Sequence, residues 1–261
     1  MQRGKELGIH SRITHAGANP DQELGSVSPP IYQSSTFRFA TAQEGARRFA
    51  GEETGFIYTR LGNPTVAALE SAVADLEGGA GALATASGMA AVNCIYLALL
   101  EAGSHLVGTD ALYGSSRRII ETEYSRFGVT YDFVDTSRPE KVAEAVQDHT
   151  RLVFLESPAN PTLKLTDIAA CADIAHRSGA LVVVDNTFMS PVLQNPLALG
   201  ADIVIHSLTK YINGHTDVVG GIIVFKTREL LERVRPVFIQ SGGCMDPHQA
   251  WLILRGLRTL G

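Results

Sequence analysis

The 261-residue sequence has few cysteines and shows no motif for a bound metal ion. Cys94, Cys171 and Cys244 are odd in number and far apart, which argues against a disulfide framework and for a reducing compartment. The eight histidines form no HExxH pattern, and no CxxC pair is present. We therefore expect neither structural disulfides nor a metal site.

Long apolar runs and strong charge are also absent. The first residues, MQRGKELGIHSRITHAG, lack the apolar core of a signal peptide, and no run reaches the length of a transmembrane helix. A net charge of −5 gives no reason to expect a nucleic-acid partner. Neither GxGxxG nor GxxxxGKS/T follows any apolar run, which disfavours the alternative of a nucleotide-binding protein. We expect a cytoplasmic globular protein without membrane or nucleic-acid partners.

What is present changes along the chain. Residues 1–60 are rich in Pro, Ser and Gly with little periodicity, so this N-terminal segment is predicted to be irregular. Residues 61–245 alternate helical patterns with short apolar runs expected to be strands: GALATAS, HLVGTD, VTYDFVD, RLVFLES, ALVVVDN, ADIVIHS and GGIIVF. This alternation predicts an α/β fold, a mainly parallel sheet with helices on both faces. Residues 246–261 begin a last apolar helix at Pro247.

Ligands of open α/β sheets bind beyond the carboxyl ends of the strands, so the residues after each apolar run are candidates. Ser87, Gly88 and Met89 follow the first run and begin a helix, whose free N–H groups suit a phosphate. An ordinary helix cap by Ser87 is the alternative. Tyr113 follows the second run and either stacks on a planar ligand or packs on the rim of the sheet.

Two later runs end on polar side chains. Asn160, between two prolines after RLVFLES, is either a turn residue or a donor to a ligand oxygen. Asp185 follows the apolar run ALVVV, with Thr187 two positions on. A carboxylate delivered to a buried strand end needs a partner, which is either a cationic ligand nitrogen or a nearby arginine.

The stretch HSLTK after ADIVI places Lys210 at a strand end, with Ser207 and Thr209 close by. A partly desolvated lysine has a lowered pKa and forms an imine with a carbonyl, whereas a lysine that snorkels to solvent is the alternative. Phosphate donors, an aromatic ring, a carboxylate and a lysine are together what pyridoxal phosphate requires. The combination therefore predicts a pyridoxal 5′-phosphate site.

Seven stretches together resemble the pyridoxal-phosphate enzymes of cysteine and methionine metabolism: IYQSSTFRF, YTRLGNPT, ATASGMAA, ALYGSS, ESPANPT, VVVDNTF and HSLTKYINGHTDVVGG. The resemblance covers nearly the whole chain. It implies the fold of type I pyridoxal-phosphate transferases, which is similar to aspartate aminotransferase. It also implies a homotetramer built from two tight dimers.

The resemblance assigns roles to the candidate residues. Lys210 is expected to be the Schiff-base lysine and proton shuttle, Asp185 the partner of the pyridinium nitrogen, and Tyr113 the catalytic aromatic stacked on the ring. Tyr58 and Arg60, in YTRLGNPT, match residues that reach the phosphate from a neighbouring subunit. The remaining cofactor contacts are expected from Ser87, Gly88, Met89, Asn160, Thr187, Ser207 and Thr209.

The implied reaction is γ-elimination or γ-replacement at a C–S or C–O bond of a sulfur-containing amino acid or an activated homoserine. HSLTKYINGHTDVVGG is most similar to cystathionine γ-synthases and γ-lyases, with methionine γ-lyase and O-acetylhomoserine sulfhydrylase as alternatives. Ser115 stands where methionine γ-lyases often carry cysteine. Gly114-Ser115 stands where bacterial cystathionine β-lyases carry Glu-Pro, which disfavours a β-lyase.

Family members also carry a C-terminal domain that binds the substrate carboxylate. The sequence ends in the expected connecting helix, so we expect this domain to be absent and the side chains of Trp251, Leu252 and Leu254 to be uncovered. A second function hypothesis follows, a cofactor-binding fragment without turnover.

Overall fold

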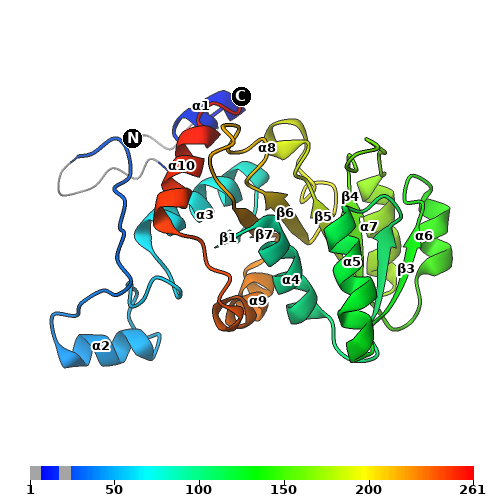
Figure 1. The fold of residues 1–261 in the computed structure, drawn as a ribbon, viewed down its shortest axis with the longest axis horizontal. Helices are drawn as coiled ribbons and strands as arrows, with labels where there is room; N and C mark the ends of the chain where they lie inside the picture. The colour runs from blue at the N-terminus through cyan, green and yellow to red at the C-terminus, as the bar shows by residue number, and fades with distance from the viewer. Residues whose placement is uncertain (1–6, 18–24) are drawn as a thin grey trace.

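The computed structural model describes residues 7–17 and 25–261, and a seven-stranded sheet forms its centre (Figure 1). The strands are β1 (Gly81–Thr85), β2 (His105–Thr109), β3 (Thr130–Val134), β4 (Thr150–Glu156), β5 (Leu181–Asp185), β6 (Ile203–Ser207) and β7 (Gly221–Phe225). Their order is β1-β7-β6-β5-β4-β2-β3, in which β7 is antiparallel to both neighbours and the other adjacent pairs are parallel. Each strand falls in one of the seven apolar runs, so the predicted α/β fold with a mainly parallel sheet is confirmed.

Helices cover both faces of the sheet. They are α1 (Ile9–Thr14), α2 (Ala42–Phe49), α3 (Pro64–Glu77), α4 (Gly88–Leu99), α5 (Gly114–Thr122), the 3-10 helix η1 (Tyr124–Phe127), α6 (Pro139–Ala145), α7 (Ile168–Arg177), α8 (Ser190–Leu193), α9 (Arg228–Ser241) and α10 (Pro247–Leu257). Side chains of α3, α7 and α10 form one apolar core with one face of the sheet. Those of α4, α5 and α9 form a second core with the other face.

The helix α3 shows how local sequence signals determine where a helix begins and ends. The Asn63 side chain accepts a hydrogen bond from the Thr65 N–H, Pro64 occupies the first turn, and Gly78 ends the helix in a left-handed conformation. The Asn63 side chain satisfies an N–H that has no partner within the helix, and Pro64 has no N–H that would need one. Gly78 adopts the left-handed conformation that ends the helix without steric cost. The position of α3 matters for the site because its last residue, Glu77, lies beneath the ends of β5 and β6.

Two predictions about secondary structure are wrong. The segment 1–60 is not irregular throughout, because it contains α1 and α2, and α2 has its own cap in the Thr41 side chain. The helix α9 was not predicted at all. Pro236 lies inside it and removes a backbone donor, but burial of apolar side chains against α4 and the sheet holds the helix.

The expectation of an uncovered apolar face on α10 is also wrong for Leu254. That side chain is 2% exposed and packs against α3 and Gly17, whereas Trp251 and Leu252 are partly buried. The helix α10 continues the core on the α3 face. The apolar pattern of this helix is therefore explained largely by contacts within the described residues.

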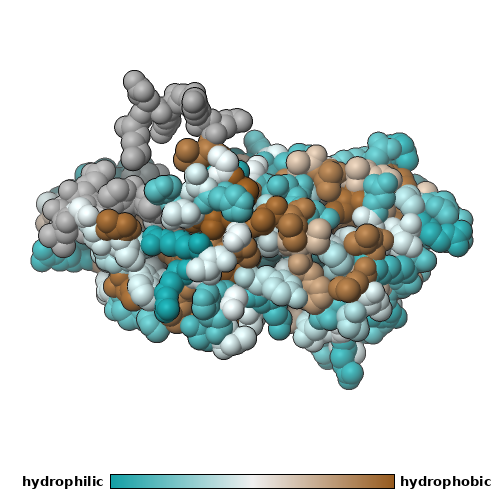
Figure 2. Space-filling view, turned by 90° about the horizontal axis from the view of Figure 1, so that it is seen from above, coloured by the Kyte–Doolittle hydropathy of each residue, from teal (hydrophilic) through white to brown (hydrophobic). Residues whose placement is uncertain are grey.

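The surface mixes polar and apolar side chains. Figure 2 shows hydrophobic areas interspersed among hydrophilic ones across the face seen from above. Apolar and aromatic side chains that remain exposed include Leu163, Leu165, Leu193, Tyr211 and Val219. Among residues 7–17 and 25–261, no helix has both the length and the apolar character needed to cross a membrane.

Candidate active site

A cavity of about 210 Å³ lies at the carboxyl ends of β4, β5 and β6, against the start of α4. Every predicted site residue except Tyr58 and Arg60 lines it: Ser87, Gly88, Met89, Tyr113, Asn160, Asp185, Thr187, Ser207, Thr209 and Lys210. A wider cavity of about 790 Å³ adjoins it and shares Asn160, Thr209 and Lys210. The strand ends therefore bring together residues that are more than 120 positions apart in the sequence.

The start of α4 forms one wall of the smaller cavity. The Ser87 side chain accepts a hydrogen bond from the Ala90 N–H at 3.1 Å, so the alternative of an ordinary cap is correct for that oxygen. A Cβ added to Gly88 would lie 3.0 Å from the Ser207 Cβ, which leaves little room for any larger residue. The glycine thus lets β6 approach the helix, and the first N–H groups of α4 lie at the cavity wall.

Asp185 is held in place by its neighbours. The Thr187 hydroxyl donates to Asp185 Oδ1 at 2.5 Å, its N–H donates to the same oxygen at 3.0 Å, and the hydroxyl accepts the Ser207 N–H at 2.8 Å. Burial raises the pKa of Asp185 because desolvation disfavours the charged carboxylate. Within the described part of the chain, no cationic side chain forms an ion pair with Asp185, so the arginine alternative is not observed. A cationic ligand nitrogen fits this carboxylate.

Glu156 is a site residue that the sequence reasoning missed. Its Oε2 accepts the Tyr113 N–H at 2.7 Å and its Oε1 accepts the Asn160 N–H at 2.9 Å. Burial, followed by the charge of Asp185, raises the pKa of Glu156 from 4.5 to about 7. One carboxylate thus holds two loops of the site. Its place at the end of the apolar run RLVFLE was the signal, the same one that marked Asp185.

Lys210 lies where the two cavities meet, and its side chain is exposed. The described residues therefore do not provide the partial desolvation that the sequence argument invoked. The backbone around it is fixed: the Lys210 N–H donates to the Ser207 carbonyl at 3.1 Å, and the Gly214 N–H donates to the Lys210 carbonyl at 2.8 Å. These two hydrogen bonds fix the backbone from which the exposed side chain extends.

Thr209 serves the same turn. Its hydroxyl accepts the Gly220 N–H at 3.0 Å and donates to the Gly220 carbonyl at 3.3 Å, which joins the turn to the start of β7. Beyond it, Gly256 of α10 lies against the backbone of Asn213, where any side chain would collide. Residues 213–221 thus support the turn that carries Lys210 through Gly220 and Asn213.

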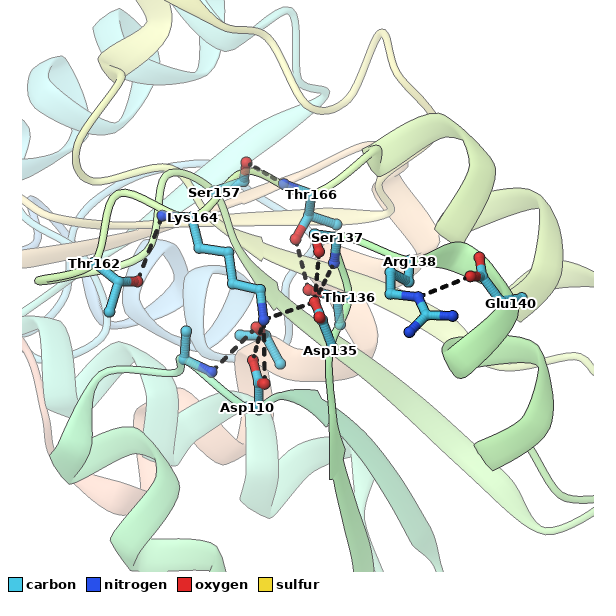
Figure 3. A network of polar contacts seen from close by, with 12 residues as sticks. Asp110, Asp135, Thr136, Ser137, Arg138, Glu140, Ser157, Thr162, Lys164 and Thr166 are labelled. Atoms are coloured by element: carbon cyan, nitrogen blue, oxygen red, sulfur yellow. Dashed lines mark hydrogen bonds and ion pairs between the residues drawn. The ribbon is translucent and has the colours of Figure 1, made fainter.

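The loop that carries Asn160 is tied to the neighbouring strand ends by a second lysine (Figure 3). Lys164 Nζ lies 2.6 Å from Asp135 Oδ1, after β3, and 3.0 Å from Asp110 Oδ1, after β2. The Thr166 and Thr136 hydroxyls share a hydrogen bond of 2.6 Å beside this ion pair. The pairing holds the pKa of Asp135 at about 2, well below its usual value, through hydrogen bonds from Lys164 and the neighbouring serine.

Tyr58 and Arg60 do not reach the cavity of Lys210 in the same chain. The Arg60 Nη1 donates to the Ile239 carbonyl at 2.9 Å, and its guanidinium lies 5.4 Å from the centre of the Tyr58 ring. Both residues line a separate cavity of about 380 Å³ with Gln33 and Cys244. Both residues lie in the connection between α2 and α3, and α2 lies away from the sheet (Figure 1).

The donor set fits pyridoxal phosphate: helix N–H groups for phosphate, a lysine for the aldehyde and a desolvated carboxylate for the ring nitrogen. Comparisons with known proteins agree with this class. A model of the Cys/Met metabolism PLP-dependent enzymes matches residues 10–261, and the chain belongs to this family. Its cofactor is pyridoxal 5′-phosphate, as the sequence predicted.

Individual relatives within this family are similar to the chain over nearly its whole length. It is 46% identical to the L-methionine gamma-lyase of Treponema denticola, over 98% of this chain and 64% of that protein. It is 44% identical to the cystathionine gamma-lyase of Bacillus subtilis, over 95% and 63%. The solved cystathionine gamma synthase of Xanthomonas oryzae superposes with a TM-score of 0.91 at 41% identity, over 98% and 64%. The chain thus spans less than two thirds of the length of these relatives.

Proposed function

We propose that the protein catalyses γ-elimination or γ-replacement at a C–S or C–O bond of a sulfur-containing amino acid, as cystathionine γ-synthase or γ-lyase does. The observation that carries this proposal is the gathering of Lys210, Asp185 and the start of α4 around one cavity. Methionine γ-lyase and O-acetylhomoserine sulfhydrylase are the alternatives within the same chemistry, and relatives named for the first of these share 46% of the sequence.

The residues of the cavity have different roles in this proposal. When bound, the cofactor supplies an aldehyde carbon and an electron-withdrawing ring. Lys210 Nζ holds the aldehyde and, once released, moves protons between substrate carbons. Asp185 keeps a proton on the ring nitrogen, because a desolvated carboxylate favours a hydrogen-bonded cation. Thr187 keeps Asp185 oriented toward that nitrogen.

The other walls of the cavity hold and orient the cofactor, and Tyr113 also takes part in the reaction. The N–H groups of Gly88 and Met89, with the Ser207 and Thr209 hydroxyls, bind the phosphate. The Tyr113 ring stacks on the cofactor and its hydroxyl assists proton transfer, while Asn160 lies near the ring hydroxyl. Glu156 sets the position of both loops through their backbone N–H groups.

Assembly completes the site in this proposal. Tyr58 and Arg60 reach the phosphate of a second subunit, which agrees with their distance from the pocket of their own chain. The protein is a cytoplasmic homotetramer made of two such dimers. Residues 1–60 are the segment that crosses to the neighbour, residues 61–245 form the cofactor domain, and residues 246–261 begin the connecting helix.

Cofactor binding is tested by spectroscopy. Titration of the purified protein with pyridoxal phosphate should produce the visible absorbance of a lysine-bound cofactor, and borohydride should bleach it and fix the label on Lys210. The variant K210A should lose both signals. If K210A absorbs and retains label as the wild type does, the lysine assignment is wrong.

A substrate panel separates the reactions. Cystathionine, homocysteine, methionine and O-acetylhomoserine are each incubated with the loaded protein, with and without cysteine as the incoming thiol, and products are assayed as 2-oxobutyrate against a new thioether. Release of a 2-oxo acid supports elimination, and thioether formation supports replacement. Cofactor binding with neither product would instead support the second hypothesis, a cofactor-binding chain without turnover.

A further inference from the structure

A buried polar network lies on the face of the sheet opposite the cofactor site. Its centre is Glu77, the last residue of α3, which is 2% exposed. Glu77 Oε1 lies 2.7 Å from His206 Nε2 and accepts the Asn186 Nδ2–H at 2.9 Å. Gln194 extends the network, because its Nε2 donates to Asn186 Oδ1 at 2.8 Å and to the Ser157 carbonyl at 2.9 Å.

The alternation of side chains along the strands places this network behind the site. Val184 and Val204 belong to the core that contains α3, whereas Val183 and Ile205 belong to the opposite core. Asp185 pairs in register with Ile205, so its side chain lies on the same face of the sheet as Val183 and Ile205. Because side chains alternate along a strand, Asn186 and His206 lie on the opposite face, toward α3. The network thus lies under the same strand ends that present the site.

Three neighbouring strand ends show the same arrangement. On β4 the site residue Glu156 is followed by Ser157, and on β5 Asp185 is followed by Asn186. On β6 the site residue Ser207 is preceded by His206. In each pair one residue faces the cavity and its neighbour in sequence hydrogen-bonds in the network. The network therefore joins the three strand ends that carry these site residues.

Packing alone does not require such a network. A buried carboxylate and a buried imidazole cost more free energy than apolar side chains of equal volume, and removing one partner leaves the other desolvated and unpaired. His206 is fully buried, and its Nδ1 has no hydrogen-bond partner in the described part of the chain. The network supplies directional hydrogen bonds between α3 and the ends of β5 and β6, the strands that carry Asp185 and Ser207.

We propose that Glu77 is a positioning residue of the cofactor site. Through His206 and Asn186 it fixes the strand ends that carry Ser207 and Asp185. The proposal rests on the proposed cofactor site, and it concerns residues that touch neither cofactor nor substrate. It predicts that removing the charge of Glu77 loosens cofactor binding and changes the orientation of the bound ring in a protein that remains folded.

The test compares two glutamates of the same helix. Glu70 is also on α3, and its Oε1 accepts the Ala84 N–H of β1 at 2.9 Å; neither residue lines the site cavity. The variants E77Q and E70Q are titrated with pyridoxal phosphate, followed by visible absorbance and by the circular dichroism of the bound cofactor. We expect E77Q to raise the dissociation constant at least tenfold and alter the dichroism, while E70Q stays within about twofold of wild type.

Two variants of His206 test the same role without changing Glu77, so this second test does not depend on whether E77Q folds. The amide of H206Q can still donate to Glu77 from nearly the Nε2 position, whereas H206L cannot. We expect H206Q to bind the cofactor more tightly than H206L, and far-ultraviolet dichroism to show that both are folded. Equal affinities for these two variants, or wild-type affinity and dichroism in folded E77Q, would overturn the positioning role.

The wild-type titration separates the two levels of inference. If the wild type gives no lysine-bound absorbance, the proposed cofactor site fails and the role of Glu77 fails with it. If the wild type binds normally and the Glu77 and His206 variants match it, only the positioning role is wrong.

Discussion

The strand-end pocket and the N-terminal arm, residues 25–63, differ in how their functional residues are held. Pocket residues are fixed by hydrogen bonds within the chain, as Asp185 is by Thr187 and Tyr113 is by Glu156. The arm carries Tyr58 and Arg60 to a separate cavity and leaves many of its side chains exposed. The difference shows that one chain can assemble the chemical centre of the site but not every residue that the family resemblance assigns to it.

The pocket side of this comparison is tested most strongly at Asp185. D185N removes the charge that, in the proposed function, holds a proton on the cofactor ring. We expect the dissociation constant for pyridoxal phosphate to rise about 100-fold, because losing one partner of a buried charge pair costs about 2–5 kcal/mol. Visible-absorbance titration measures it.

The matched control is T187V, which keeps the carboxylate and removes only the hydroxyl that orients it. We expect about a tenfold loss, because the lost hydroxyl donates to the Asp185 carboxylate and also accepts the Ser207 N–H. Affinity that falls less in D185N than in T187V would contradict the role given to the carboxylate.

The arm side is tested by complementation. We expect R60A to weaken cofactor binding about 10- to 100-fold, since a charge-assisted contact to phosphate is worth about 1.5–3 kcal/mol. Co-expressed R60A and K210A chains should recover tight binding in mixed dimers, because the intact Arg60 of one chain serves the intact pocket of the other.

The control for this experiment is R47A, an exposed arginine of α2 paired with Glu53. It should bind the cofactor as the wild type does. If co-expression of R60A with K210A restores nothing, Arg60 acts within its own chain or not at all, and the contrast between pocket and arm disappears.

The buried carboxylates of the sheet region predict a pH-dependent stability. Burial raises the pKa of Glu70 from 4.5 to about 7, so the folded state binds a proton more tightly than the unfolded state. This contribution to the free energy of unfolding is complete below pH 4.5 and is lost as the pH rises to about 7. E70Q keeps the acceptor for Ala84 but does not titrate.

Urea denaturation at pH 5 and pH 8 measures the effect. From pH 5 to pH 8 the free energy of unfolding should fall by up to about 3 kcal/mol more in the wild type than in E70Q. The raised pKa of Glu70 sets this upper limit. Glu156, whose pKa burial also raises to about 7, contributes to the dependence that remains. Equal losses in both proteins would show that Glu70 does not carry the proton.

The smallest effect is expected at the rim of the pocket. Lys164 pairs with Asp110 and Asp135 in a partly exposed position, where water and salt screen the interaction. K164M should lower the midpoint of thermal unfolding by about 2 °C or less, and the difference should shrink in 1 M salt. A loss that persists at high salt would mean that packing, not charge, holds the Asn160 loop.

Much of the fold was predictable because local signals agreed with the tertiary structure. The seven apolar runs became strands, and Pro247 marked the start of the last helix. The helix α9 was missed because Pro236 contradicts the local pattern and contacts distant in sequence override it. Glu156 was missed although it ends a buried strand as Asp185 does, because a carboxylate that binds backbone N–H groups has no sequence motif of its own.

The sequence by itself determined the alternating α/β architecture, the lysine and carboxylate at strand ends, and the family. These follow from periodicity and from short motifs, which are properties of neighbouring residues. The tertiary structure decided which residues share a cavity, that Thr209 is tied to Gly220, and that Glu77 lies behind the site. Those facts depend on strand order and on which face each side chain takes, and both are set by packing between segments far apart in the chain.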